Sequence, residues 1–177
     1  MPVLTTPRAA AIVCALLPGL AHAAEPSFQF TAIEGGTIDL ADFRGHPVLV
    51  VNTASLCGFT PQYDDLQALS DKYQSRGLVV LGVPSNDFNQ ELASGAEVKE
   101  FCELNFNLKI PLTEITHVIG PDAHPFYQWM AQSHNFTPGW NFNKILIGAE
   151  GQVLGTWGSA PKPTASAITS RIEAALP

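Results

Sequence analysis

A single cysteine stands where an apolar, strand-like run gives way to a helical pattern. Residues 48–51 read Val-Leu-Val-Val, and residues 52–63 read Asn-Thr-Ala-Ser-Leu-Cys-Gly-Phe-Thr-Pro-Gln-Tyr, with Cys57 in the middle. A thiol near a helix N-terminus lies among unpaired backbone N–H groups and the positive end of the helix dipole, which favour the reactive thiolate. The pattern therefore predicts a nucleophilic Cys57. The alternative is a core residue, because free cysteine is among the most buried residue types.

Two further motifs follow Cys57 in chain order. Residues 81–88 read Leu-Gly-Val-Pro-Ser-Asn-Asp-Phe and lead to Gln90 and Glu91, and the last motif is Trp140-Asn141-Phe142 with Lys144. Together the three motifs resemble the signatures of the glutathione peroxidase family, which has cysteine or selenocysteine at the position of Cys57. Three motifs in order are far more specific than one. The resemblance runs from Phe28 to about Pro163.

The resemblance implies an active site. Cys57 would attack the peroxide, and Gln90, Trp140 and Asn141 would be its partners. Peroxide reduction needs a thiolate, which is oxidised to a sulfenic acid. It also needs hydrogen-bond donors that stabilise the leaving oxyanion. The three partners carry N–H donors and no charge that would repel an anion. Taken singly, each has an ordinary structural role as a loop, core or turn residue, and the order of the motifs favours catalysis.

Cys102 lies in the segment Glu-Phe-Cys-Glu-Leu-Asn-Phe, residues 100–106. The resemblance implies a resolving cysteine here, as in the cysteine-containing, thioredoxin-dependent members of the family. Two alternatives stay open: a permanent disulfide with Cys57, or a plain core residue. A disulfide needs Cα atoms within about 7 Å of each other. A cysteine on a buried helix face would therefore require local unwinding before it could react with Cys57.

The second motif departs from the family pattern at several positions. Ser85 stands where many members have a third cysteine, and Asp87 replaces the usual glutamine. The stretch from Phe88 to Gln90 is one residue shorter than is common, and Leu92-Ala93 replaces the usual Pro-Gly. We therefore expect a differently shaped loop around Gln90.

Hydrophobic periodicity predicts a βαβ unit followed by a hairpin and a closing helix. Expected strands cover 48–51, 78–83, 144–148 and 152–157, and expected helices cover 61–76, 95–105 and 165–176. Residues 28–40 around Gly35-Gly36 predict an N-terminal hairpin. Two continuously apolar strands joined by a helix are typical of a parallel pair. Pattern and resemblance together predict an α/β, thioredoxin-like fold with a central mixed sheet flanked by helices.

The first 23 residues differ in composition from the rest of the chain. Arg8 is their only charge, an apolar run spans 9–20, and Ala21-His22-Ala23 offers small residues for cleavage. This pattern is typical of a secretory signal peptide cleaved after Ala23. The apolar run is too short to span a bilayer. We expect a periplasmic or secreted protein in which residues 24–177 form a single thioredoxin-like peroxidase domain.

Composition also limits the partners. With 9 basic and 16 acidic residues the net charge is −7, which disfavours nucleic acid. His46, His117, His124 and His134 have no metal-ligand spacing, so we expect no metal and no cofactor. The expected partners are a hydroperoxide substrate and a thiol reductant, either a thioredoxin-like dithiol protein or glutathione. The short stretch between His124 and Trp140 favours a monomer.

Two other functional classes compete with the peroxidase hypothesis. A thioredoxin-like thiol-disulfide oxidoreductase would need Cys-x-x-Cys, but Thr60 occupies the fourth position of that motif. The other class is a non-enzymatic module, either a redox sensor that passes oxidation to a partner or a copper-binding module, and a copper site would need two nearby thiols and a histidine. The sequence leaves open the electron donor, the preferred hydroperoxide, and whether a bond between Cys57 and Cys102 is catalytic or static.

Overall fold

The computed structural model describes residue 1 and residues 26–177, so the predicted signal peptide lies almost wholly outside the described residues. The strands are β1 Gln29–Thr31, β2 Thr37–Asp39, β3 Val48–Thr53, β4 Val79–Pro84, β5 Lys144–Ile147 and β6 Val153–Trp157. The α-helices are α1 Gln62–Tyr73, α2 Gly95–Phe106, α3 Pro125–His134 and α4 Ser166–Ala175. Short 3₁₀ helices cover Leu40–Phe43 and Gln74–Arg76.

The central sheet has the strand order β4-β3-β5-β6. β3 pairs with β4 in parallel, while β5 is antiparallel to both β3 and β6. The helix α1 makes the crossover between the parallel strands, as the continuously apolar sequences of both strands predict. The predicted mixed sheet flanked by helices is confirmed.

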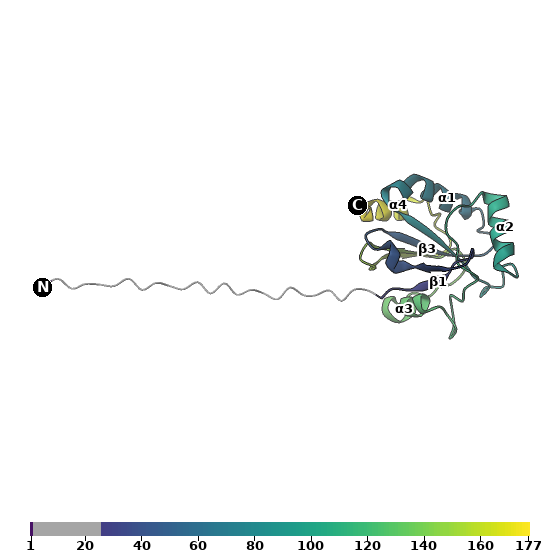
Figure 1. Cartoon of the computed structure of the whole chain (residues 1–177), viewed down its shortest axis with the longest axis horizontal. Coiled ribbons are helices and arrows are strands. Elements are labelled where there is room, and N and C mark those ends of the chain that lie inside the picture. Colours follow the sequence, from purple (N-terminus) through teal and green to yellow (C-terminus); the bar gives the residue numbers. More distant parts are fainter. Residues whose placement is uncertain (2–25) are drawn as a thin grey trace.

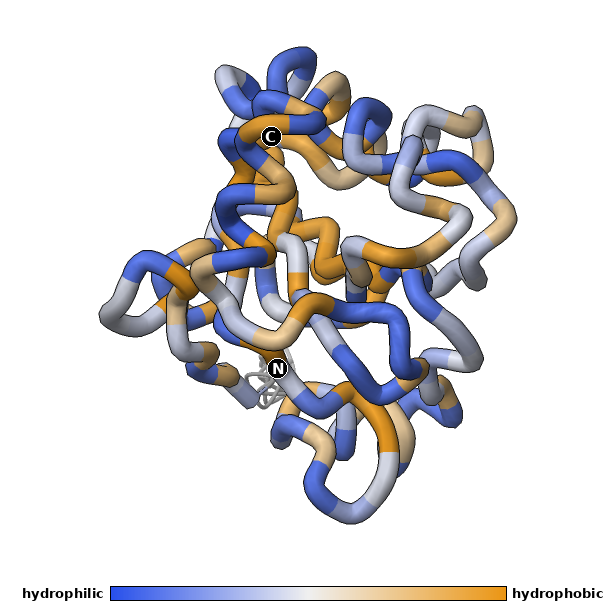
Figure 2. Tube along the Cα trace, turned by 90° about the vertical axis from the view of Figure 1, so that its right-hand side faces the viewer, coloured by the Kyte–Doolittle hydropathy of each residue, from blue (hydrophilic) through white to orange (hydrophobic). Residues whose placement is uncertain are grey.

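Hydrophobic side chains fill both faces of this sheet. Leu49, Val51 and Leu146 pack with α1, α2 and α4, whereas Val48 and Val50 pack with α3 and the N-terminal segment. Alternate residues of a strand point to opposite faces, which divides one apolar run between two cores. Figure 1 shows α1 and α4 on one side of the sheet and α3 on the other. In Figure 2 hydrophobic stretches cross the middle of the molecule, and its outer turns are largely hydrophilic.

The predicted N-terminal hairpin is confirmed as β1 and β2, which pair in antiparallel register. Gly35 and Gly36 have φ values of +91° and +83° in its turn, a conformation that glycine adopts at little cost. The hairpin is also joined to a later loop, because Ile33 N donates to Leu112 O and Glu114 N donates to Thr31 O. These bonds fix the hairpin beside the sheet.

Helix α3 was not among the predicted elements. Its start has recognisable signals: the His124 side chain accepts a hydrogen bond from Phe126 N, and Pro125 occupies the first helical turn. Phe126 and Met130 are buried against the second face of the sheet. The stretch after His124, to which the sequence analysis assigned no element, is therefore helical up to His134, where the helix ends.

Within the described part of the chain, no helix has the length and apolar character needed to cross a bilayer.

Candidate active site

Three segments meet at one edge of the central sheet. β3 and β4 run in parallel and end at Thr53 and Pro84, which are paired in register. β5 runs the opposite way and begins at Lys144, which pairs with Val51. The carboxyl ends of β3 and β4 therefore lie beside the start of β5. The residues that follow β3, follow β4 and precede β5 all leave the sheet at this one end of the strands. This topology brings the three sequence motifs together although 83 positions separate Cys57 from Trp140.

Cys57 lies in a series of tight turns between β3 and α1. Its thiol is free and its residue is only 4% exposed, although the preceding Leu56 is 61% exposed. Phe59 N donates to Cys57 Sγ at 3.5 Å, and Thr60 N donates to Cys57 O. Because α1 begins only at Gln62, the donor at the sulfur belongs to the preceding turn. The expectation that helix-terminal N–H groups surround this thiol is corrected accordingly.

Gln90 and Asn141 are in direct contact. Asn141 Nδ2 donates to Gln90 Oε1 at 3.0 Å, and Asn141 is fully buried. Gln90 also lies beside the Cys57 turn, because Leu56 N donates to Gln90 O at 2.8 Å. The shorter stretch from Phe88 to Gln90 thus still brings Gln90 to the motif of Asn141. Asn89 takes a left-handed φ of +56° within this stretch.

Trp140 is the exposed member of the group, with 41% of its surface accessible. Its ring lies 5.2 Å from that of Phe88, measured between centroids. Its carbonyl oxygen accepts hydrogen bonds from Asn52 Nδ2 at 3.0 Å and Asn143 Nδ2 at 2.7 Å. The backbone of Trp140 is therefore fixed from two sides while its indole faces solvent. The core-residue alternative for Trp140 does not fit this exposure.

Glu91 is a further residue of this region that sequence reasoning left without a role. Its Oε1 accepts hydrogen bonds from Ser55 N at 3.0 Å and Leu92 N at 2.9 Å. Burial raises the pKa of this carboxyl, and hydrogen bonds from Ser55 and Leu92 oppose the rise. Glu91 thereby ties the segment before Cys57 to the second motif. Its position directly after Gln90 was the available signal.

The departure at Asp87 has a structural explanation. Its carboxylate is hydrogen-bonded to His117 Nδ1 at 2.7 Å and accepts from Val118 N and Ile119 N at 2.6 and 3.1 Å. Burial opposes ionisation of Asp87, but these hydrogen bonds outweigh it and lower the pKa of the carboxyl. Asp87 thus anchors the loop after β4 to the segment before α3.

Cys102 lies on the buried side of α2 and is 1% exposed. It also carries a free thiol, and it belongs to the same hydrophobic core as Cys57. Burial raises the pKa of the Cys102 thiol to about 11, with a smaller opposing effect from the neighbouring Tyr63 hydroxyl. That hydroxyl is itself buried without a hydrogen bond of regular geometry. Cys102 is thus held as a neutral thiol inside an intact helix.

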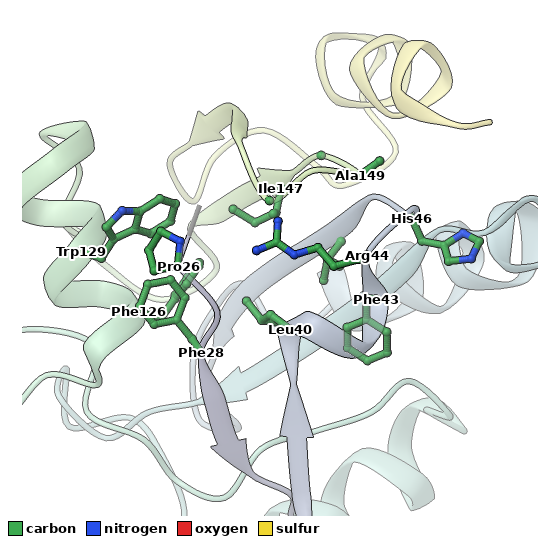
Figure 3. Close-up of a pocket in the computed structure, with 13 residues that line it drawn as sticks. Pro26, Phe28, Leu40, Phe43, Arg44, His46, Phe126, Trp129, Ile147 and Ala149 are labelled. Atoms are coloured by element: carbon green, nitrogen blue, oxygen red, sulfur yellow. The ribbon is translucent and has the colours of Figure 1, made fainter. Parts of the chain in front are cut away.

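Among the described residues, several cavities lie outside this group, and two of them border the N-terminal segment. One, of about 440 Å³, lies between the N-terminal hairpin and α2, with Cys102 in its wall. The other is the pocket shown in Figure 3, where Phe28, Phe126 and Trp129 form an apolar wall and Arg44 lies across from them. None of the residues of the three motifs lines either cavity. These two cavities therefore lie apart from the residues of the three motifs.

Comparison with known proteins agrees with this arrangement. The glutathione peroxidase family profile matches residues 26–131. The chain is 41% identical over 150 residues to the hydroperoxy fatty acid reductase gpx1 of Synechocystis sp., covering 77% of this chain and 87% of that protein. It is 41% identical over 136 residues to the glutathione peroxidase-like peroxiredoxin gpx1 of Schizosaccharomyces pombe, covering 73% and 85%.

Solved structures show the same relationship. The crystal structure of Trgpx in apo form is 33% identical, with a TM-score of 0.67 over 84% of this chain and 92% of that one. A thiol:disulfide interchange protein of the thioredoxin family from Chlorobium tepidum TLS has a TM-score of 0.63 at 19% identity, over 86% and 94% of the two chains. The second likeness shows the thioredoxin-like fold alone. The first, with the family profile and the sequence relatives, identifies this chain as a member of the glutathione peroxidase family and a thiol peroxidase of that type.

Proposed function

We propose that this enzyme reduces hydrogen peroxide and organic hydroperoxides through the thiol of Cys57. The observation that carries the proposal is the contact between Gln90 and Asn141 beside the Cys57 turn. Asn141 donates to the carbonyl oxygen of the Gln90 side chain, an orientation that leaves the Gln90 Nε2 donors for other partners. These donors can serve a thiolate or a developing oxyanion.

The chemical step follows from the groups present. The Cys57 thiolate attacks one peroxide oxygen, a sulfur–oxygen bond forms, and the oxygen–oxygen bond breaks. The other oxygen leaves as hydroxide or alkoxide and takes up a proton, giving water or an alcohol and a sulfenic acid on Cys57. The donors of Gln90, Trp140 and Asn141 stabilise the negative charge on the leaving oxygen.

The exposed edge of the site supports a broad peroxide preference. Trp140 and Leu56 are both exposed large apolar residues, and each is part of a motif segment. An apolar surface beside the thiol can receive the chain of an organic hydroperoxide. The Synechocystis relative, named as a hydroperoxy fatty acid reductase, supports including such substrates.

Cys102 is proposed to resolve the sulfenic acid. Its thiol would attack the Cys57 sulfur, release water and leave an intramolecular disulfide, which a thiol donor then reduces by exchange. Because Cys102 is buried within α2, this step requires the helix to open locally. A dithiol protein of the thioredoxin type suits an intramolecular disulfide better than glutathione does, since one dithiol supplies both thiols.

The decisive experiment is replacement of Cys57. Cys57→Ser should abolish peroxide consumption, because a hydroxyl is almost never ionised near neutral pH. Cys102→Ser is the matched control: it should react once with peroxide and then stall or over-oxidise. Retained turnover in Cys57→Ser would refute the assignment of the peroxidatic residue. Assays with glutathione and with a thioredoxin-like dithiol, run side by side, identify the reductant.

Export and oligomeric state form the last part of the proposal. We propose that residues 1–23 are a signal peptide and that the mature enzyme is a monomer in the periplasm or outside the cell. The support is the sequence pattern described above. Mass spectrometry of the protein from the producing cell should show an N-terminus at Ala24, and sedimentation should give the monomer mass. An uncleaved N-terminus would contradict the proposed export.

A further inference from the structure

Lys144 is the charged member of the third motif, and the mechanism above assigns it no role. It is the first residue of β5 and is fully buried. Its Nζ lies within hydrogen-bonding distance of three carbonyl oxygens of one loop: Gly158 O at 3.4 Å, Ser159 O at 3.1 Å and Pro161 O at 2.6 Å. The ammonium group thus binds the backbone of the 158–161 loop through these carbonyl oxygens.

That loop holds Asn141 in turn. Ser159 Oγ donates to Asn141 O at 2.6 Å and accepts from Asn143 Nδ2 at 3.1 Å. The Ser159 carbonyl, which Lys144 binds, also accepts a hydrogen bond from Gln62 Nε2 at 2.8 Å. The chain of contacts therefore runs from Lys144 through Ser159 to the Asn141 backbone and to the start of α1.

An ammonium group at this position is an unfavourable choice for stability alone. Removing a charge from water is costly, and an apolar side chain could fill a buried strand position without that cost. Among the described residues no carboxylate forms an ion pair with Lys144. The charged group that acts on it from the facing helix is Asp65, whose carboxylate also accepts a hydrogen bond from Thr164. Stability alone therefore does not explain Lys144, and its hydrogen bonds to the 158–161 loop point to a role in holding that loop.

We propose that Lys144 is a positioning residue, which in its protonated form holds the 158–161 loop so that Asn141 stays against Gln90 and Cys57 reacts with peroxide. The proposal rests on the proposed function only for its effect on rate. A charged ammonium offers three N–H donors to the three carbonyls. A neutral amine has two, and its lone pair repels the third oxygen. Loss of the proton should therefore loosen the loop.

The proton can leave within an accessible pH range. Burial lowers the pKa of Lys144 to about 8, and the negative charge of Asp65 partly offsets this effect. We therefore expect the rate of Cys57 oxidation to fall as the pH rises through about 8. A thiolate alone gives the opposite trend, because alkaline pH only increases its population. An alkaline fall in rate is thus a signature of Lys144 and not of Cys57.

The test combines a rate and a structural signal. Stopped-flow oxidation of Cys57 by hydrogen peroxide is measured from pH 6 to 10 in the wild type, Lys144→Met and Ser159→Ala, with Lys162→Met as the control on an exposed lysine of the adjoining segment. In Lys144→Met the rate per folded molecule should drop about 10- to 100-fold at neutral pH, the scale of a misplaced active-site group, and the alkaline fall should vanish. Ser159→Ala should be slow but keep the fall, and Lys162→Met should match the wild type.

The structural signal is the side-chain amide resonance of Asn141 in ¹⁵N NMR spectra of the reduced protein. It should shift with a midpoint near pH 8 in the wild type, and Lys144→Met should not show this transition. This measurement needs no peroxide, so failure of the peroxidase proposal would leave it intact. If Lys144→Met does not fold, the pH dependence of the rate in the wild type and the rate of Ser159→Ala still test the proposal. A wild type without an alkaline fall in rate, an Asn141 signal that ignores pH, or a normal rate in Ser159→Ala would overturn the inference.

Discussion

Oxidation of the two thiols to a disulfide tests whether Cys102 is a resolving residue or a static cross-link. Cys57 and Cys102 are 45 positions apart, and both thiols are free in the structure. For a closed loop of about 46 residues, loop-closure entropy predicts that a strain-free disulfide stabilises the fold by about 4 kcal/mol. For a domain of this size, that corresponds to a rise in Tm of roughly 8–16 °C.

The structure predicts a much smaller gain. Cys102 lies within α2, and its carbonyl accepts hydrogen bonds from Asn107 N and Leu108 N at the helix end. Opening the last turns of α2 would expose Cys102 and separate Phe106 from Tyr63, whose rings are 5.1 Å apart. Losing the full burial of a large apolar side chain costs roughly 1.5–3 kcal/mol, and Cys102 and the partly buried Phe106 each lose at most this much. This cost offsets much of the entropic gain, so oxidation should raise the Tm by well under 8 °C or lower it.

The assay is calorimetric unfolding of the protein in its reduced form and after one equivalent of hydrogen peroxide. Cys102→Ser with the same oxidant is the control, because it gains a sulfenic acid without a disulfide. Hydrogen exchange should show that the amides of the second half of α2 lose protection in the oxidised protein. An oxidised form whose Tm rises by 8 °C or more, and which resists a dithiol reductant, would refute this reasoning and make Cys102 a structural cross-link.

Two other substitutions test the site and its support. Asn141→Ala should slow oxidation of Cys57 about 10- to 1,000-fold, since it removes a donor and the partner of Gln90; a normal rate, measured by stopped flow, would make the third motif structural. Asp87→Asn should lower the free energy of unfolding by about 1–3 kcal/mol at pH 7, measured in urea, because it weakens the bonds to His117 and two backbone N–H groups. Burial opposes ionisation of Asp87, yet these bonds lower its pKa, so its contribution to stability is present above the unfolded-state pKa of about 4 and is lost as the pH falls below it. The free energies of unfolding of the wild type and Asp87→Asn should therefore converge in acid. A difference that persists there would contradict this explanation.

Much of the scaffold follows from local sequence patterns. The apolar runs of β3 and β4, joined by the helical spacing of α1, predict a parallel pair because each pattern reflects which faces are buried. The direction of those strands then places the Cys57 turn and the second motif at one sheet edge. Helix α2 and the hairpin β5–β6 were also predicted, since their turn residues and periodicity lie within a few positions of each other.

The tertiary structure decided what depends on contacts between distant residues. The bond between Asn141 and Gln90 joins residues 51 positions apart, and no local pattern specifies it. The sequence likewise placed Cys57 next to a helix end, whereas packing inserts further turns before α1 and gives the sulfur a different donor. The clustering of carbonyls around Lys144 arises only when the 158–161 loop folds over the start of β5. Periodicity reports which face of an element is buried, but hydrogen bonds between elements form only once the elements are packed, and those bonds determine the geometry of this site.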